Sequence, residues 1–485
     1  MKKWIIPITI ILIFIVFIGI LIFMGLPNFI EYYKQIKEQS SMQKAFILDE
    51  QFTNDQKEIK DFQVGKSYSV ILYEDGTVWV AGSNYYYNDG EIYGLQRDTF
   101  TRVNIENVDK ISVGNNFVLA LTKNGEVYSW GGNDYGQLGR EDYGVDDIPK
   151  KLELNNIKEI YTKDNQAAAL SNDNVAYYWG YATRSNYSGY DKILKLENQK
   201  ITDIFLIGYK YFFKTEDGKI LGLGFNFEVL TDEVNGWATK PVEFDISNVK
   251  YIREKGESEA FIIKDDGTAY TLNPKESKEL TKIESNVKIN DIYCFEWSLE
   301  EEQKYFIIDE NNNLYYNNKC IMQNVKNITH AKMSSSSEKI LILKEDGTVY
   351  NFGYLVDNLT KTEGYSDYFR TTPIKLNVQN IKLLGITDYY AILVDYNNKI
   401  YRLGKSYRGG LGIEENQIVK DFQGEVTNST EYNNIVTNNN TINQNTKVYD
   451  ESNYQEGIKA GEPYYYKLDN GETILIDPAM STMAD

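Results

Sequence analysis

Short runs of alternating hydrophobic and polar residues fill most of the chain, and tight-turn dipeptides separate them. The clearest turns are Asp-Gly or Asn-Gly pairs at residues 75–76, 124–125, 217–218, 266–267 and 346–347, and weaker copies are centred on Asn174, Asn312 and Asn398. Such pairs between two β-rich runs predict hairpins in which both central residues take positive φ. Successive turns lie 35 to 51 residues apart, so the pattern predicts eight repeated units.

Each unit contains four strand-like runs, two in the hairpin and two beyond it. The second run of the hairpin follows the turn and usually ends in glycine, as in TVWVAG at residues 77–82 and EVYSWG at 126–131. Two more runs around an asparagine connect one hairpin to the next, as in residues 149–160. Four strands in each unit are the make-up of a propeller blade, so the sequence predicts an all-β fold, a β-propeller of four-stranded blades.

A long apolar run lies near the N-terminus. Residues 4–30 carry no charge and are long enough to cross a bilayer at ~1.5 Å per residue. A cleaved signal peptide, which is the alternative, would have a shorter apolar region and a small-x-small cleavage site. We therefore expect one uncleaved transmembrane α-helix in residues 1–30. Lys2 and Lys3 before it favour a cytoplasmic N-terminus and an extracytoplasmic propeller, which makes the chain a single-pass membrane protein.

The composition divides the rest of the chain into four segments. Residues 31–56 lack glycine and proline and are expected to form a helical stalk or linker. Residues 57–426 hold the propeller repeats, and residues 427–457 are an Asn/Thr-rich linker. Residues 458–485 contain one more hairpin signal at Asn470-Gly471, and this hairpin is expected to dock on the propeller or on a partner.

One unit carries a set of glycine-rich landmarks in a fixed order. Residues 111–140 contain Gly114, Asn124-Gly125, Val127 to Gly131 and Gly136 to Gly139, and this stretch resembles a repeat of the regulator of chromosome condensation family. Residues 409–412 are a worn copy of the last landmark. The resemblance implies a β-propeller, usually seven-bladed, that serves as a platform for protein partners. With eight units counted, we expect a propeller of seven or eight blades.

The repeats depart from that family in their histidines. Family repeats often carry a histidine after the first glycine, whereas Phe117 and Tyr68 stand near those positions here. The whole chain has a single histidine, His330. The Gly-His and Trp-Asp marks of the WD-type propeller therefore cannot recur.

The overall charge argues against nucleic acid as a partner. The formal net charge is -19 and the isoelectric point is about 4.8, so the chain repels phosphate backbones and offers no extended basic surface. Cys294 and Cys320 are too few for a disulfide scaffold, and we interpret them as free or incidental thiols.

Residues suited to catalysis or metal binding form no convincing set. His330 is followed by Ser334 to Ser337, but an acyl-transfer triad also needs an orienting acid. Cys294, Cys320 and His330 show no close pair of zinc-ligand spacing. Acidic turns such as Glu74-Asp75-Gly76 offer oxygens to Ca²⁺, yet a hairpin turn favours Asp before Gly in any case. We expect no catalytic residue, no metal and no cofactor.

Several loops are rich in tyrosine and tryptophan. Equivalent positions in successive blades emerge on one face of a propeller, where aromatic side chains with a polar handle favour a protein or carbohydrate interface. Chance placement in a Tyr-rich chain is the alternative. The predicted binding residues are Tyr85, Tyr86, Tyr87, Tyr135, Tyr181, Tyr187, Trp237, Tyr365, Tyr368 and Tyr407.

Together these features predict a membrane-anchored, non-catalytic propeller that presents a binding face to an extracellular protein or glycan. An extracytoplasmic carboxylate-based glycosidase is the first alternative, because its paired acids need no histidine. Nucleotide exchange on a small GTPase, or inhibition of an enzyme, is a further alternative that only the family resemblance implies.

Overall fold

The computed structural model describes the propeller repeats and three short strands beyond them. The described residues are 57–83, 86–88, 91–93, 96–141, 145–181, 193–225, 237–255, 259–273, 279–294, 305–316, 318–333, 337–353, 370–413, 417–419, 426–428, 448–449, 464–467 and 473–476. The predicted transmembrane helix and stalk, residues 1–56, lie outside this set. Within it, no helix combines the length and the apolar character needed to cross a bilayer.

Eight antiparallel sheets form the blades of a propeller in the first of two compact units, Met1–Val426. Blade 1 consists of β1 (Ile59–Val64), β2 (Tyr68–Tyr73), β3 (Val78–Ser83) and β6 (Gln96–Arg102). Blade 2 consists of β7 (Val108–Val113), β8 (Phe117–Thr122), β9 (Val127–Gly132) and β10 (Val145–Lys151). Blade 3 consists of β11 (Ile157–Lys163), β12 (Gln166–Ser171), β13 (Ala176–Gly180) and β14 (Leu194–Lys195). Blade 4 consists of β15 (Ile201–Ile207), β16 (Lys210–Thr215), β17 (Ile220–Phe225) and β18 (Trp237–Phe244).

The remaining four sheets complete the ring. Blade 5 consists of β19 (Val249–Glu254), β20 (Ala260–Lys264), β21 (Ala269–Leu272) and β22 (Leu280–Lys282). Blade 6 consists of β23 (Ile289–Cys294), β24 (Tyr305–Asp309), β25 (Leu314–Tyr316) and β26 (Lys319–Met322). Blade 7 consists of β27 (Val325–Met333), β28 (Ser337–Lys344), β29 (Val349–Gly353) and β30 (Arg370–Lys375). Blade 8 consists of β31 (Ile381–Ile386), β32 (Tyr390–Asp395), β33 (Ile400–Lys405) and β34 (Gln417–Val419), with β35 (Val426–Asn428) added at its edge.

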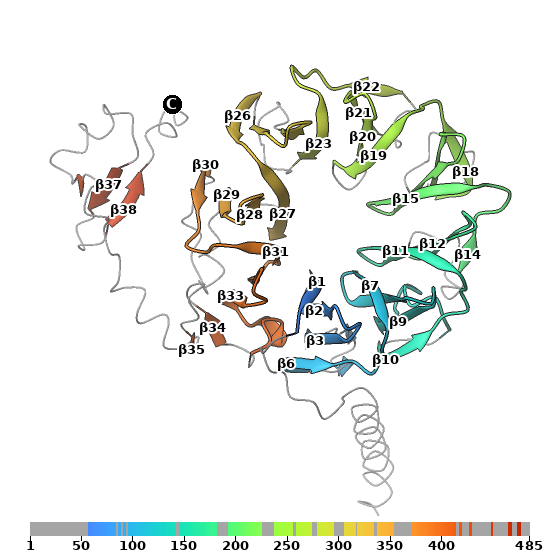
Figure 1. The fold of residues 1–485 in the computed structure, drawn as a ribbon, viewed down its shortest axis with the longest axis horizontal. Coiled ribbons are helices and arrows are strands. Elements are labelled where there is room, and N and C mark those ends of the chain that lie inside the picture. The colour runs from blue at the N-terminus through green and yellow to red at the C-terminus, as the bar shows by residue number, and fades with distance from the viewer. Residues whose placement is uncertain are drawn as a thin grey trace, which may run out of the picture. The chain divides into compact units, whose positions relative to one another are not determined.

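The first strand of every blade lies next to the propeller axis, and the fourth strand lies at the rim (Figure 1). The predicted all-β propeller is thus confirmed, with eight blades where the expectation left seven or eight open. In the described part of the chain, each of these sheets is built from one continuous stretch of the sequence, so β1 to β3 meet β31 to β33 without sharing a strand. The ring therefore closes by side-chain packing between its first and last blades.

Closure rests on a hydrophobic cluster shared by blades 1 and 8. Ile59, Trp79, Tyr390 and Leu411 all belong to it, and all four are at least 97% buried. Similar clusters fill the other interfaces between neighbouring blades. The second strand of a blade packs on both sides, which is why β2, β8, β12 and β32 are buried along their whole length.

The hairpin turns differ from the predicted geometry. In the first of them the amide of Gly76 donates to Tyr73 O at 2.9 Å, and Gly76 alone has positive φ, at 82°. This is a type I turn followed by a glycine bulge, and the expectation that both central residues take positive φ was wrong. Asp75 instead accepts from the amide and the hydroxyl of Thr77, at 2.9 and 2.6 Å.

The same turns also join neighbouring blades. Gly76 O accepts from the amide of Val108 in the next blade at 3.1 Å, and Gly125 O accepts from the amide of Ile157 at 3.1 Å. At the closing interface a side chain makes the equivalent bond, because Asn398 Oδ1 accepts from the amide of Ile59 at 2.9 Å. The contact between blades 8 and 1 thus copies the contacts between consecutive blades.

A β-bulge recurs at the start of every inner strand. The ladder skips the second residue of β1, since Ile59 pairs with Tyr73 and Asp61 with Leu72, and the same shift occurs in all eight blades. We call the skipped positions the bulge residues: Lys60, Asp109, Lys158, Thr202, Lys250, Asn290, Lys326 and Lys382. A recurring bulge places equivalent side chains at one height around the axis.

The asparagines that connect consecutive blades adopt the left-handed conformation. Asn107, Asn156, Asn198, Asn248, Asn324 and Asn380 have φ between 57° and 61°. Asparagine tolerates this region because its short polar side chain hydrogen-bonds locally. Their carbonyls are used as well: the amide of Lys123 donates to Asn107 O at 2.9 Å.

The second compact unit, Thr427–Asp485, contains a small sheet of three strands. β37 (Tyr464–Lys467) pairs antiparallel with β38 (Thr473–Ile476), and β36 (Val448–Tyr449) lies parallel to β37. The turn at Asn470-Gly471 and the predicted linker around residues 429–447 lie outside the described residues.

Candidate functional site

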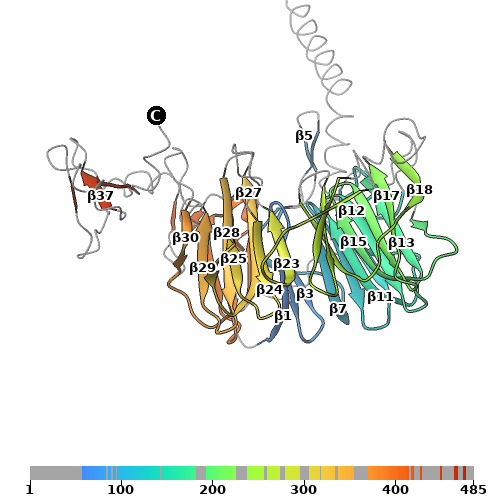
Figure 2. The same cartoon turned by 90° about the horizontal axis from the view of Figure 1, so that it is seen from above.

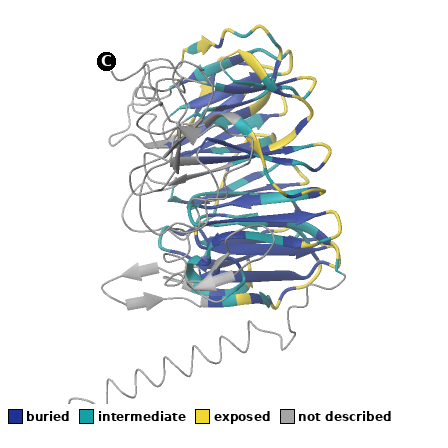
Figure 3. Cartoon of the chain, turned by 90° about the vertical axis from the view of Figure 1, so that its left-hand side faces the viewer, coloured by how far each residue is buried: buried dark blue, intermediate teal, exposed yellow. Residues whose placement is uncertain are grey.

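The two faces of the propeller carry different connections. The hairpin turns and the blade-to-blade connections share one face, which we call the turn face, and many of their residues are exposed (Figure 3). The turns between first and second strands, and the connections from third to fourth strands, share the other face, which we call the loop face. The short hairpin of β4 (Tyr86–Asn88) and β5 (Glu91–Tyr93) extends from the loop face (Figure 2).

The structure describes only part of the predicted aromatic residues, and these lie on the loop face. The side chains of Tyr135, Tyr181 and Tyr407 are described and half-buried. Tyr86 and Tyr87 lie in β4 and Trp237 lies in β18, where the backbone alone is described. Tyr85, Tyr187, Tyr365 and Tyr368 fall outside the described residues. The ring of aromatic side chains therefore stays a prediction.

Three tyrosines from consecutive blades form one cluster on this face. Tyr135 follows the third strand of blade 2, and its ring meets that of Tyr181 in blade 3 edge to face, with centroids 4.9 Å apart. Tyr181 in turn contacts Tyr209 of blade 4 at 4.6 Å. Tyr209 was missed in the sequence, although it stands in the turn just before β16, the counterpart of Asn116 before β8. We call these three residues the tyrosine cluster.

A second aromatic pair lies in blade 8. The rings of Tyr389 and Tyr407 stack with centroids 3.9 Å apart, and the guanidinium of Arg408 lies 5.1 Å from the Tyr407 ring. Burial is the largest cause of a raised pKa at Tyr389, so its hydroxyl stays protonated at neutral pH. Tyr389 was also missed, and it occupies the same turn position as Tyr209.

The residues that carry the family resemblance have a structural role. The loop of residues 133–140 folds over the edge of blade 3, where the indole nitrogen of Trp179 donates to Gln137 O at 2.9 Å. Leu138 is fully buried in the cluster between blades 2 and 3. The loop that contains the Gly-Gln-Leu-Gly landmark therefore holds blades 2 and 3 together, and we call a loop with this role a clamp.

Blade 8 repeats this clamp on blade 1. Leu411 is fully buried among the residues of the closing cluster, and Ser69 Oγ of blade 1 donates to Gly410 O at 2.7 Å. Within blade 8, the Arg402 side chain donates to Leu411 O at 2.7 Å. Residues 409–412, the partial copy of the landmark, thus hold blades 8 and 1 together at the closing interface.

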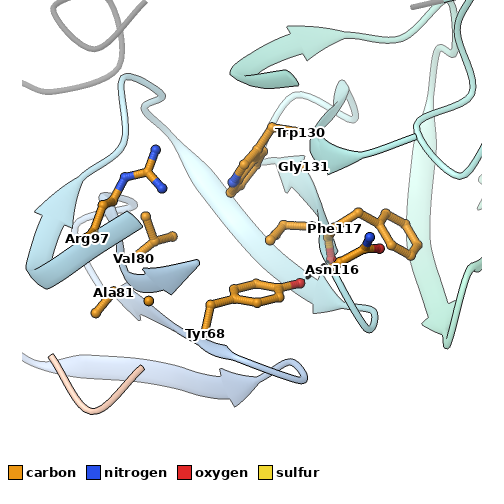
Figure 4. A pocket seen from close by; sticks show the side chains of 10 residues that line it. Tyr68, Val80, Ala81, Arg97, Asn116, Phe117, Trp130 and Gly131 are labelled. Atoms are coloured by element: carbon orange, nitrogen blue, oxygen red, sulfur yellow. Dashed lines mark hydrogen bonds between the residues drawn. The ribbon is translucent and has the colours of Figure 1, made fainter. Parts of the chain in front are cut away.

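Other side chains stand where family repeats often carry histidine. The hydroxyl of Tyr68 donates across the interface to Phe117 O at 2.6 Å and contacts Gly114 O at 3.1 Å (Figure 4). Tyr390 occupies the same position in blade 8 and reaches Ser69 Oγ at 3.2 Å. Tyr68 and Tyr390 therefore bond one blade to the next without a histidine at these positions.

A pocket between blades 1 and 2 is too small for an organic ligand. Tyr68, Arg97, Phe117 and Trp130 line it (Figure 4), and its volume of about 10 Å³ has room for roughly one water molecule. The guanidinium of Arg97 lies 3.8 Å from the carboxylate of Asp147 in blade 2, and both side chains are buried. Burial lowers the pKa of Arg97, and Asp147 opposes that shift. We interpret this region as part of the interface between the blades.

Asp134 is the acidic neighbour of the tyrosine cluster. Burial raises the pKa of its carboxyl group to about 6, and one carboxylate oxygen is buried without a hydrogen-bond partner. Asp134 therefore carries a half-buried negative charge at pH 7, above its pKa.

Removing that charge is expected to stabilise the protein at neutral pH. The pKa of Asp134 is higher in the folded state, about 6, than in the unfolded state, about 3.9, so folding stability rises as the pH falls through 6 towards 4. Asp134→Asn should therefore have a higher melting temperature than the wild type at pH 7. The gap should shrink by pH 4.5, and a gap independent of pH would contradict the burial of this carboxylate. Thermal unfolding at both pH values provides the comparison.

The structure also places the weaker candidates for chemistry. Cys294 and Cys320 are free thiols, and His330 lies in β27, where its backbone alone is described. In the part of the chain that the structure describes, no three His, Cys, Asp or Glu side chains gather as metal ligands.

Two family models match the chain. Both describe the regulator of chromosome condensation (RCC1) repeat, and they match residues 108–137 and 124–161. Together these residues contain all four strands of blade 2 and the start of blade 3, so the predicted resemblance to an RCC1-like repeat family is confirmed. None of the curated proteins compared with the chain matches it significantly.

Several solved structures show a loose likeness to this chain. Prp20p from Saccharomyces cerevisiae is 18% identical, and the match covers 76% of this chain and 86% of that chain with a TM-score of 0.44. Yeast RCC1 (Prp20) bound to Kap60 is 18% identical over 66% and 75% of the two chains, with a TM-score of 0.42. Human WBSCR16 is 16% identical over 70% and 88%, with a TM-score of 0.43.

Proposed function

We propose that this RCC1-like propeller is a membrane-anchored, non-catalytic binding protein whose loop face engages an extracellular protein or glycan. The tyrosine cluster is the observation that supports this most strongly. It brings together one side chain from each of three consecutive blades, with ring centroids 4.9 and 4.6 Å apart. Packed, partly exposed tyrosines offer a large apolar surface and hydroxyl groups that bond to a polar partner.

The anchor in this proposal comes from the sequence. The uncharged run of residues 4–30 has the length of a bilayer-spanning helix, and the lysines before it favour a cytoplasmic N-terminus. Such an arrangement would hold the propeller outside the cell, with residues 31–56 as the spacer. Protease treatment of intact cells tests the orientation, because propeller fragments should be released only from the outer side.

Glycoside hydrolysis stays the alternative. It needs a carboxyl group with a raised pKa, such as that of Asp134, and a second carboxylate ~5–10 Å away. The tyrosine cluster is the observation that favours binding over this alternative.

Site-specific photo-crosslinking in intact cells tests the loop face. We expect a photoreactive phenylalanine analogue in place of Tyr181 of the full-length protein to give a discrete adduct. The same analogue in place of Tyr396 serves as the control, because Tyr396 is 52% exposed and lies on the turn face. Adducts from Tyr396 only, or from neither position, would contradict the proposal.

Removal of the neighbouring Tyr209 ring should lower the yield of the adduct formed from position 181. Tyr209→Ala is expected to cost about 1–2 kcal/mol of binding, or roughly tenfold in affinity, because a packed aromatic anchor is lost. The adduct yield from position 181 should fall accordingly, while Tyr396→Ala should leave it unchanged.

A further inference from the structure

Side chains from three consecutive blades form a connected group beside the propeller axis. The inner strands β11, β15 and β19 lie next to the axis (Figure 1), which brings residues of non-adjacent blades within reach of one another. The group consists of residues from blades 3, 4 and 5, and we call it the axial cluster: Tyr161, Lys163, Asp203, Tyr251, Arg253 and Glu254.

An ion pair between blades 3 and 5 shows that the cluster is one site. Lys163 Nζ lies 2.8 Å from Glu254 Oε2, although blade 4 stands between these two blades. Lys163 ends β11 and Glu254 ends β19, so the pair lies towards the loop face. The pair therefore bridges the inner strand of blade 4 on the side of the axis.

Two further contacts join blade 4 to its neighbours. The hydroxyl of Tyr161 donates to Asp203 Oδ1 at 3.1 Å, and burial raises the pKa of this carboxyl group. The ring of Tyr251 meets that of Phe205 edge to face, with centroids 5.4 Å apart. Phe205 follows Asp203 by two residues on the same strand. Tyr161 and Tyr251 therefore approach the same stretch of blade 4 from opposite sides.

Arg253 is held in a fixed orientation. Its Nε and Nη2 atoms donate to the two carboxylate oxygens of Asp291 in blade 6, both at 2.7 Å. The guanidinium carbon also lies 4.0 Å from the ring centroid of Tyr293 and 5.1 Å from that of Tyr251. The bidentate pair uses only part of the N–H groups of the guanidinium, so the others keep a set direction beside the Tyr251 ring.

The cluster is accessible to solvent, and its ion pairs cancel. Tyr251 is 40% exposed, and the side chains of Lys163 and Glu254 are 39% and 33% exposed. The charge of Lys163 is balanced by Glu254, and that of Arg253 by Asp291. This surface therefore offers an aromatic ring and fixed hydrogen-bonding groups rather than a strong charge of one sign.

We propose that the axial cluster binds a neutral sugar. A sugar ring has apolar C–H faces that pack on an aromatic side chain, and its hydroxyl groups both donate and accept hydrogen bonds. Tyr251 provides the exposed ring, while Arg253 and Glu254 provide donors and acceptors. The net charge of -19 disfavours acidic sugars. This site is distinct from the tyrosine cluster and does not depend on the function proposed for it.

A binding assay on the full-length protein tests the proposal, in a polyoxyethylene detergent that contains no sugar. The probes are oligosaccharides of glucose, galactose, mannose and N-acetylglucosamine, with sialic acid and uronic acid oligosaccharides for comparison. We expect a neutral probe to bind. Tyr251→Ala should raise its dissociation constant about tenfold, because the exposed ring is lost. Tyr251→Phe keeps the ring and should bind within a few-fold of the wild type.

Tyr396→Ala is the matched control. It removes a tyrosine that is 52% exposed on the turn face, so it should leave the affinity for the sugar unchanged. Arg253→Lys keeps the charge but removes the planar fork, and it should weaken binding about fivefold. Thermal unfolding of each variant checks that the propeller remains folded.

The proposal is overturned if the wild-type protein binds acidic probes only or no probe at all, or if Tyr251→Ala and Tyr396→Ala weaken binding equally. Loss of sugar binding in Tyr209→Ala, with Tyr251→Ala unaffected, would also overturn it and place the sugar at the tyrosine cluster. Sugar binding that depends on Tyr251, without a photo-crosslinked adduct from position 181, would support the axial site and contradict the function proposed for the loop face.

Discussion

Replacing Leu411 with alanine is expected to lower the free energy of unfolding by about 2–5 kcal/mol and to open the ring between blades 8 and 1. Leu411 is fully buried among Ile59, Trp79 and Tyr390, so its truncation leaves a cavity in the closing cluster. Blades 1 and 8 are held together by packing and hydrogen bonds, and the strands that the structure describes include none that they share. When this packing is lost, no strand described in the structure holds blades 1 and 8 together.

The equivalent change in the other clamp provides the control. Leu138→Ala removes an equally buried leucine between blades 2 and 3, which the chain connects directly. Both variants should unfold at lower denaturant concentration, but amide exchange in β1 and β31 should accelerate more in Leu411→Ala, because local separation of blades 8 and 1 adds to global unfolding. Unchanged exchange in β1 and β31 would contradict closure through this clamp.

Gly131→Ala is expected to destabilise the protein by about 3 kcal/mol or more, because two penalties combine at this position. Gly131 has a φ of 112°, which an L-residue with a side chain rarely adopts. A Cβ atom there would also lie 2.5 Å from Asn116 O in the adjacent turn. This close approach explains the glycine that ends the third strand in most units.

Gly218 is the control, because alanine there meets the backbone penalty without the steric one. Gly218 has a φ of 85°, and a Cβ atom there would meet nothing within 4 Å. Gly218→Ala should therefore cost only about 1 kcal/mol, the price of the left-handed conformation alone. Chemical denaturation measures how much unfolding free energy each variant loses. Equal losses in Gly131→Ala and Gly218→Ala would contradict a steric role for Asn116 O.

The repeated sequence pattern predicted the fold because every blade has the same order of strands and turns. The Asp-Gly and Asn-Gly pairs marked the hairpins, and the runs after them were the third strands. The exact turn type could not be predicted, since a three-residue bulged loop and a two-residue loop use similar residues. The bulge beside Lys60 and its counterparts was also invisible, because a register shift depends on pairing between strands.

The candidate site was less predictable than the fold. Loop position on a common face could be inferred from the repeats, so Tyr135 and Tyr181 were found. Tyr209 and Tyr389 lie in short turns beside the inner strands, and only the three-dimensional contact shows that they join the loop residues. The burial of the Asp134 carboxylate likewise follows from tertiary packing and leaves no mark in the sequence.

The propeller is a closed ring of eight blades, and among the described strands its first and last blades meet without exchanging one. Single-particle electron microscopy of the full-length protein tests it most directly. We predict eight radial sheets of density, with β1 packed against β31 and separate backbone density for each. Seven blades, a gap between β1 and β31, or a strand of the C-terminal region within blade 1 would contradict it.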